Sequence, residues 1–147
     1  MATLNKSKKL VLDNSMLEHD YFENSALIGI VCPYDSHRFI WHLNKAFNFD
    51  FQRDHTCEIN TEKRSFEVYT FIEDEKLISH TIYTNRKKTD FMLEEAKNID
   101  FIWMIKAGYL QKTYIELLTE VLKKMNVVVY SFPIHYENLK SKQLLIL

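Results

Sequence analysis

The sequence predicts an α+β fold, a two-layer sandwich in which two amphipathic helices pack on a mixed, mainly antiparallel sheet of about six strands. Apolar residues recur at helical spacing in 36–48 and 111–125. The runs 26–31, 101–105 and 127–132 are apolar on both alternating faces, which is typical of interior strands covered on both sides. Alternating segments between these runs predict further antiparallel strands.

The first third of the chain is expected to supply one strand and one helix. Residues 1–9 are polar and rich in lysine, so we expect a flexible terminus, and residues 10–12 are apolar enough for a short strand. Pro33 ends the first apolar run, and Asp35 is placed to cap a helix that runs from residue 36 to about residue 48. The apolar stripe of this helix consists of Phe39, Ile40, Leu43, Ala46 and Phe47.

The middle of the chain alternates in the manner of strands. Segments 55–60, 65–73 and 77–84 predict an antiparallel meander of three strands, joined by short polar turns. A polar loop at 85–90 and one helical turn at 94–98 then lead into the next strand.

The run 101–105 is the most apolar strand of the chain. Phe101, Trp103 and Ile105 alternate with Ile102 and Met104, so both faces of the strand are apolar. At about 1.5–3 kcal/mol for each buried side chain, the five together contribute about 7–15 kcal/mol. Both faces therefore need cover. We expect the N-terminal segment, the tail or a second copy of the chain to cover the face containing Trp103 or its neighbours.

The last third is expected to supply a second helix, a third interior strand and a docking tail. Gly108 ends the preceding strand, and the helical stripe over 111–125 consists of Tyr114, Leu117, Leu118, Val121, Leu122 and Met125. Asn126 stops this helix, and Pro133 ends the strand 127–132. The tail, 134–147, finishes with four apolar residues. We expect them to dock on the chain's own sheet, or alternatively on a partner or a homodimer mate.

Composition predicts a single domain over 1–147 and excludes several classes of function. No apolar run approaches the roughly 20 residues that span a bilayer. Two cysteines and an N-terminus without a secretory pattern favour the reducing cytoplasm. Only two glycines occur, which excludes a P-loop and a dinucleotide fingerprint. The net charge of −1 makes whole-domain binding to nucleic acid less favoured.

The segment 93–101 reads Leu-Glu-Glu-Ala-Lys-Asn-Ile-Asp-Phe. It resembles the signature of the IPExxxVDY family, small proteins of Bacteroidetes-type bacteria, although Glu94 replaces the family's proline. The matching positions are Leu93, Glu95, Ile99, Asp100 and Phe101. Weaker similar fragments lie at 27–30, 38–44, 85–86, 106–108 and 138–142. The resemblance implies a single cytoplasmic domain with no assigned activity, so it supplies no catalytic residues.

The first predicted helix carries the strongest candidate for an interaction surface. At about 100° per residue, Trp41 points away from the buried stripe and lies between Arg38 and Lys45. Tryptophan and arginine are enriched in binding hot spots. The alternative is that Trp41 packs under another segment of its own chain, because large aromatic side chains are usually mostly buried.

Basic residues gather in two turns, at 63–64 and 86–88. Such runs are usually solvated, and the alternative is that they contact the phosphate backbone of RNA. Asn85 and Arg86 have additional weight as binding candidates because they match a family fragment.

We predict no catalytic residue, metal or cofactor. His55 and Cys57 lie two apart on a predicted strand, and His80 is placed to approach them, but no metal-binding motif or orienting third group accompanies them. Glu94 and Glu95 are expected to begin a helical turn, and Asp100 to cap one.

The sequence thus favours a non-enzymatic binding or adaptor domain that acts on a protein partner or as a homodimer. An RNA- or ribosome-associated protein that uses Arg38, Lys45, Arg86, Lys87 and Lys88 is the alternative, and whether these cations share one face discriminates the two. A small enzyme without a recognisable motif comes third.

Overall fold

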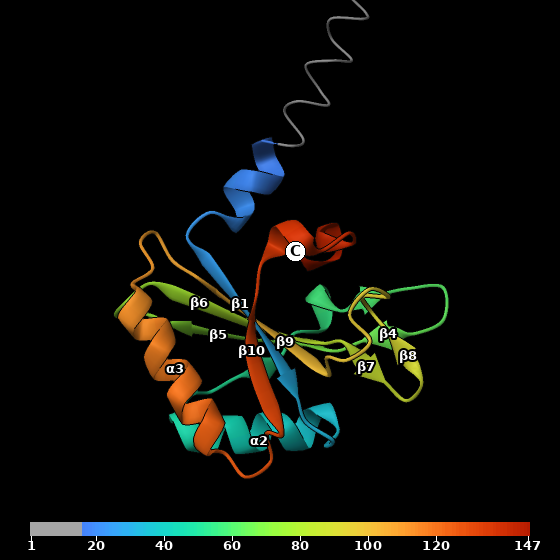
Figure 1. Ribbon diagram of the computed structural model, residues 1–147, viewed down its shortest axis with the longest axis horizontal. Coiled ribbons are helices and arrows are strands. Elements are labelled where there is room, and N and C mark those ends of the chain that lie inside the picture. The colour runs from blue at the N-terminus through green and yellow to red at the C-terminus, as the bar shows by residue number, and fades with distance from the viewer. Residues whose placement is uncertain (1–15) are drawn as a thin grey trace, which may run out of the picture.

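The computed structural model in Figure 1 describes residues 16–147, so the expectations for 1–9 and 10–12 lie outside the described residues. Its main sheet has six strands in the order β10-β1-β9-β6-β5-β2, and every neighbouring pair is antiparallel. The strands are β1 (Ser25–Val31), β2 (Gln52–Arg53), β5 (Val68–Glu73), β6 (Ile78–Thr84), β9 (Phe101–Lys106) and β10 (Tyr130–Ile134). The predicted α+β class is confirmed, and the main sheet, predicted to be mixed, is antiparallel at every described pair.

Two amphipathic helices, α2 (Ser36–Phe47) and α3 (Lys112–Lys124), follow the predicted stripes closely. The Asp35 carboxylate accepts from the backbone N–H of Arg38 at 3.3 Å, which caps α2 at its first turn. Asn48 ends α2 in the left-handed conformation, at φ 55°. Residues 16–22 are also helical, next to the start of β1 (Figure 1).

Both faces of the sheet are buried. On one face, α2 and α3 close a core around Trp103 that includes Ile28, Ile30, Phe39, Leu43, Phe101, Ile105, Leu118 and Leu122. On the other face, Ile102 and Met104 belong to a second core, with Leu27, Val68 and Tyr83. All five side chains of 101–105 are at most 2% exposed, as the double apolar pattern of this run predicts.

The second face is covered by segments that lie far apart in the chain. They contribute Phe22 from the helical residues 16–22, Leu93, Ala96 and Ile99 from the signature segment, and Leu139 and Leu145 from the tail. The Tyr83 hydroxyl donates to the backbone oxygen of Leu145 at 2.5 Å. The tail therefore docks on its own sheet. Because Trp103 faces the helices, the covering segments pack against its neighbours Ile102 and Met104 instead.

The predicted three-stranded meander is wrong at its first strand. Residues His55–Cys57 form a 3₁₀ turn, and β3 (Ile59–Asn60) pairs with β4 (Ser65–Phe66) in a separate small sheet. The Asp54 carboxylate accepts from the backbone N–H of Thr56 at 3.0 Å, and this local bond competes successfully with strand pairing. Only β5 and β6 remain as the expected hairpin.

The signature region also differs from the prediction at two places. Within 85–90, β7 (Arg86–Lys87) pairs with β8 (Asp90–Phe91), so the expected loop is a small hairpin. The expected helical turn at 94–98 is instead two consecutive turns, in which the N–H groups of Ala96 and Ile99 donate to the backbone oxygens of Leu93 and Ala96.

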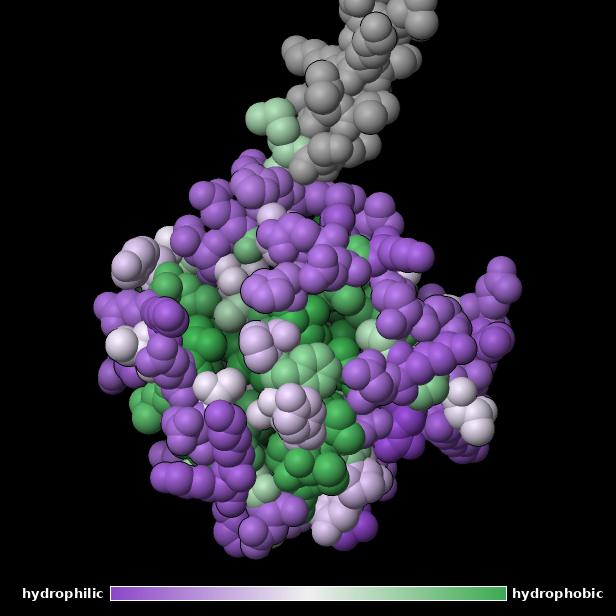
Figure 2. Space-filling view, viewed as in Figure 1, coloured by the Kyte–Doolittle hydropathy of each residue, from purple (hydrophilic) through white to green (hydrophobic). Residues whose placement is uncertain are grey.

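The third predicted interior strand is an edge strand. The run 127–132 shifts to β10, which pairs only with β1 and contains Pro133 within it. Proline is tolerated at an edge because its missing N–H faces away from the sheet. Figure 2 shows apolar surface in the middle of the view, where Figure 1 places β10. Tyr130, the first residue of β10, is 61% exposed, and Val129, just before it, is 70% exposed.

Gly29 allows the edge strand to lie close. A Cβ atom at this position would approach the ring of Phe132 to 3.0 Å. A larger residue at this position would therefore require the side chains of Phe132 and Ile134 to move by a few tenths of an ångström.

Candidate functional site

The outward face of α2 is the main candidate surface. Trp41 is 58% exposed, and its ring has two neighbours within its own helix. The Lys45 ammonium lies 4.6 Å from its ring centroid, and the His42 ring meets it edge-on at 4.9 Å. Trp41 does not pack under another segment of the described chain. Of the two interpretations of Trp41, the structure supports exposure at the surface and not packing under another segment.

The neighbouring cation on α2 is arranged in the same way. The Arg38 guanidinium lies over the Tyr34 ring, 4.4 Å from its centroid. A surface hollow of about 390 Å³ is lined by His37, Arg38, Trp41 and His42. Cation–π pairs hold both cations beside aromatic rings while leaving their charges in water. This face of α2 (the Trp41 face) thus combines aromatic area with fixed positive charge.

Asn85 is not a surface residue. It is 0% exposed, and its side-chain amide donates to the backbone oxygens of Ala96 and Ile99, each at 2.8 Å. Its side-chain oxygen accepts from the N–H of Leu93 at 2.9 Å. Three hydrogen bonds from one buried side chain fix the signature segment against the end of β6. Because Asn85 is buried, its position does not support the prediction that it is a binding residue.

Asp100 joins three parts of the chain in the same region. Its carboxylate accepts from the backbone N–H of Cys32 at 2.8 Å and forms an ion pair with Arg86. One third of the Arg86 side chain remains exposed. These contacts tie the end of β1 to the start of β9 and to β7.

The remaining signature residues also have structural positions. Leu93 and Ile99 are buried, and the Phe101 ring stacks on Phe39 with centroids 4.4 Å apart. The Glu95 carboxylate accepts from the backbone N–H of Ser141 at 2.6 Å, and so holds the tail. Burial opposes ionisation of Glu95, but hydrogen bonds from backbone N–H groups outweigh it and lower its pKa.

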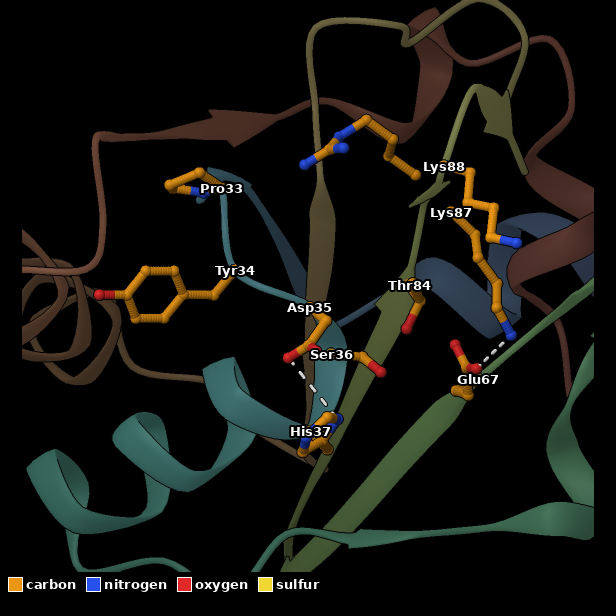
Figure 3. A pocket seen from close by; sticks show the side chains of 10 residues that line it. Pro33, Tyr34, Asp35, Ser36, His37, Glu67, Thr84, Lys87 and Lys88 are labelled. Carbon is orange, nitrogen blue, oxygen red and sulfur yellow. Dashed lines mark hydrogen bonds and ion pairs between the residues drawn. The ribbon is translucent and has the colours of Figure 1, made fainter.

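A hollow of about 340 Å³ lies between the start of α2 and the 84–88 segment (Figure 3). We call it the α2 hollow. It is lined by Pro33, Tyr34, Asp35, Ser36, His37, Glu67, Thr84, Arg86, Lys87 and Lys88. Lys87 forms an ion pair with Glu67, which is 9% exposed. The Thr84 hydroxyl is buried and has no hydrogen-bond partner among the described residues.

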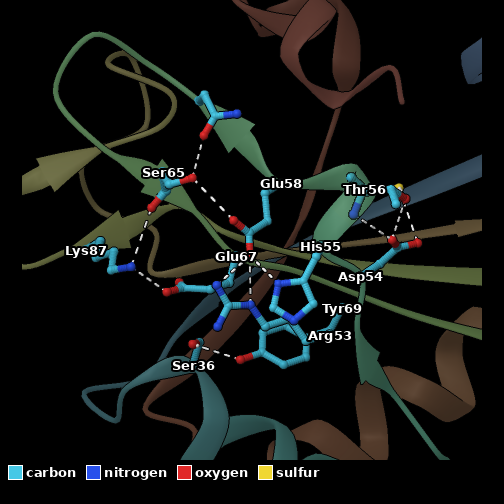
Figure 4. A network of polar contacts seen from close by, with 12 residues as sticks. Ser36, Arg53, Asp54, His55, Thr56, Glu58, Ser65, Glu67, Tyr69 and Lys87 are labelled. Atoms are coloured by element: carbon cyan, nitrogen blue, oxygen red, sulfur yellow. Dashed lines mark hydrogen bonds and ion pairs between the residues drawn. The ribbon is translucent and has the colours of Figure 1, made fainter.

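One wall of the α2 hollow continues into a network of polar contacts (Figure 4). The Ser36 and Tyr69 hydroxyls lie 3.0 Å apart, and burial raises the pKa of Tyr69. Beyond them, Glu58 accepts from Arg53 Nε at 2.8 Å and from the Ser65 hydroxyl at 3.3 Å. The hydrogen bonds from Arg53 lower the pKa of Glu58. These groups satisfy one another and stabilise the wall.

A second polar cluster is buried under the helices. The Trp103 indole N–H donates to His80 Nδ1 at 3.1 Å, and His80 Nε2 lies 2.8 Å from Glu73. Tyr114 also donates to Glu73. Because an indole N–H only donates, His80 Nδ1 must accept, and His80 is the neutral tautomer that donates from Nε2. Burial lowers the pKa of His80 and raises that of Tyr114.

The predicted approach of His80 to His55 and Cys57 is wrong. His55 is exposed beside Glu58, the Cys57 thiol donates to Asp54, and His80 lies in the helix-side core. Within residues 16–147, no group of three or more His, Cys, Asp or Glu is placed to hold a metal ion.

Two further groups of charged residues from the sequence, the carboxylates Glu94 and Asp100 and the basic turn 63–64, do not form a shared pocket. Glu94 pairs with Lys97 at the surface, away from Asp100. In the basic turn 63–64, Arg64 forms an ion pair with Asp90.

The sequence missed the α2 hollow and the His80 cluster. Both bring together residues from distant parts of the chain, such as Ser36 with Tyr69 and Glu73 with Tyr114. No local spacing indicates such pairs.

Comparison with protein-family models finds no match to this chain, and comparison with curated proteins finds no significant match either. The resemblance to the IPExxxVDY family therefore stays a prediction. In the described part of the chain, no helix is both long enough and apolar enough to cross a membrane.

Proposed function

We propose that this chain is a non-enzymatic binding or adaptor domain of the bacterial cytoplasm, and that it recognises a protein partner through the Trp41 face. The observation that carries the proposal is the exposed Trp41 ring with the Lys45 ammonium 4.6 Å from its centroid. A large aromatic ring beside fixed cations is the composition of a binding hot spot. The opposite side of α2, with Phe39 and Leu43, is fully used in the core.

The chemistry of the face indicates what a partner must offer. Arg38, Lys45 and the flanking His37 and His42 face outward or are partly exposed, and the nearest carboxylate on this helix is the cap, Asp35. A partner surface with an apolar or aromatic group flanked by carboxylates would complement it. The earlier argument for a homodimer loses weight, because the tail and the signature segment already cover the second face of the sheet.

The proposal is tested by affinity capture from native cells with three forms of the tagged protein: wild type, Trp41→Ala and Leu117→Ala. Leu117 is a matched control because it is 62% exposed on the other helix, α3. We expect a defined partner that wild type and Leu117→Ala retain and Trp41→Ala loses. Trp41→Ala should shift the melting temperature by no more than about 2 °C, since exposed substitutions rarely exceed about 0.5 kcal/mol. Identical partners in all three forms would contradict the proposal.

An RNA-associated role is the second candidate, and ribonuclease treatment of half the lysate separates it from the first. Of the nominated cations, Arg86 and Lys87 are ion-paired with Asp100 and Glu67, which reduces the charge they offer to phosphates. Arg38, Lys45 and Lys88 retain theirs in the described part of the chain. Partners that disappear with ribonuclease, together with binding that weakens steeply with salt, would favour this role.

A further inference from the structure

The α2 hollow contains a buried group whose hydrogen-bonding capacity is unused. Thr84 is 3% exposed, and its hydroxyl finds no partner in the described protein. In Figure 3 the hydroxyl points into the space in front of Ser36. Buried hydroxyls in native proteins nearly always have a partner, so one that is free and directed into a hollow indicates a ligand atom there.

Further donors converge on the same space from α2. Ser36 and His37 are the first residues of this 12-residue helix, where backbone N–H groups have no intrahelical acceptor. The helix dipole also makes this end positive, and helix N-termini bind oxyanions for these reasons. The Ser36 hydroxyl, 3.0 Å from that of Tyr69, adds a hydroxyl at the rim.

The charges around the α2 hollow leave one cation unpaired. Lys87 is neutralised by Glu67, and Arg86 is neutralised by Asp100. Lys88 has no ion pair within residues 16–147, and it is exposed at a left-handed position, φ 58°. Asp35 is the opposing carboxylate, and it is occupied at the helix cap and beside His37. The Arg86 guanidinium engages Asp100 through Nε, and a guanidinium has further N–H donors.

We propose that the α2 hollow binds a phosphate-type oxyanion, either free or as the phosphomonoester of a small molecule. The Thr84 hydroxyl, the first N–H groups of α2 and Lys88 are its donors. Tyr34 and Pro33 supply an apolar wall for the remainder of an ester. The two surfaces share His37, but Thr84 and Lys88 do not line the hollow beside Trp41, so variants at these two residues test this inference separately from the proposed function.

Thermal unfolding in inorganic phosphate, against chloride at equal ionic strength, tests the site. Phosphate should raise the melting temperature of the wild type by about 2–4 °C, since a ligand stabilises the state that binds it. Thr84→Val keeps the shape and removes the hydroxyl. It should raise the melting temperature without phosphate, because an unpartnered buried hydroxyl is lost, and it should abolish the phosphate shift.

Two matched controls make this result specific. Among the described residues, Ser131 carries the other buried hydroxyl without a partner and does not line the α2 hollow, so Ser131→Ala should keep the phosphate shift. Lys88→Gln should lose most of the shift, whereas Lys63→Gln, which removes an exposed lysine elsewhere, should retain it.

A glycerol phosphate arm separates the two sources: a larger shift than that of inorganic phosphate at equal concentration identifies an ester. No shift in the wild type, or an equal shift in Thr84→Val and Lys88→Gln, would overturn the proposal.

Discussion

The two tryptophans of this chain have opposite surroundings. Trp103 is 0% exposed on the central strand, meets the Phe47 ring edge-on at 5.1 Å and donates its N–H to His80. Trp41 is 58% exposed, and its close contacts, His42 and Lys45, lie within its own helix.

The difference teaches how to separate structural from interacting aromatic residues. The fold depends on the contacts that Trp103 makes with other elements, whereas within residues 16–147 no other element packs on Trp41. A large aromatic side chain that stabilises little of its own protein leaves its surface available to another molecule.

The largest expected effect comes from exchanging each tryptophan for alanine. Trp103→Ala should lower the free energy of unfolding by about 3–5 kcal/mol, because it leaves a cavity in the core and removes the donor to His80. Trp41→Ala should change it by no more than about 0.5 kcal/mol. Denaturant unfolding of both variants measures the difference. A loss above about 2 kcal/mol for Trp41→Ala would place Trp41 in the same class as Trp103.

A second comparison sets Asn85 against Trp41, since both were nominated as binding residues. Asn85→Ala would leave the N–H of Leu93 and the backbone oxygen of Ile99 without their side-chain partner, and the backbone oxygen of Ala96 with only the N–H of Ile99. Each buried unsatisfied group costs about 1–3 kcal/mol, so with partial access of water we expect a loss of about 3 kcal/mol. Amide exchange over 92–99 should become faster. Asn138→Ala, at an exposed asparagine, is the control; equal exchange in both variants would remove Asn85 from its structural role.

Local patterns in the sequence predicted the helices and the central strand well. The stripe of α2, its cap at Asp35 and the outward direction of Trp41 all follow from spacing within one helix. The double apolar run 101–105 is likewise a property of consecutive residues.

The turn at His55–Cys57 follows from the local bond between Asp54 and Thr56, but other errors arise where a contact between distant residues decides the outcome. The apolar run 127–132 indicates burial but does not say which neighbour a strand has, and Pro133 fits because β10 is at the edge. From the sequence, Asn85 resembles a polar loop residue. Its three hydrogen-bond partners, on Leu93, Ala96 and Ile99, lie 8 to 14 positions away, and only the fold brings them to it. The α2 hollow needs Ser36 and Thr84 to meet, which only the assembled sheet achieves.

The smallest expected effect is a pH dependence of stability that arises from His80, the histidine beside Trp103. His80 beside Trp103 is neutral in the fold, and burial lowers its pKa below the ordinary value of about 6.5. Below a pH of about 6.5, His80 therefore binds a proton in the unfolded chain but not in the folded protein. Stability is complete above this pH, and it falls as the pH decreases, by up to about 1.4 kcal/mol per pH unit.

Urea unfolding at a series of pH values checks this slope in the wild type and in His80→Gln, which does not titrate. The slope should be smaller in His80→Gln, although that variant is less stable throughout. His135→Gln, at an exposed histidine, should keep the slope of the wild type. If His80→Gln and the wild type had the same slope, then His80 would accept its proton in the folded protein. The Trp103 N–H would then face a second donor, and the hydrogen-bonded cluster that distinguishes Trp103 from Trp41 would have a different arrangement.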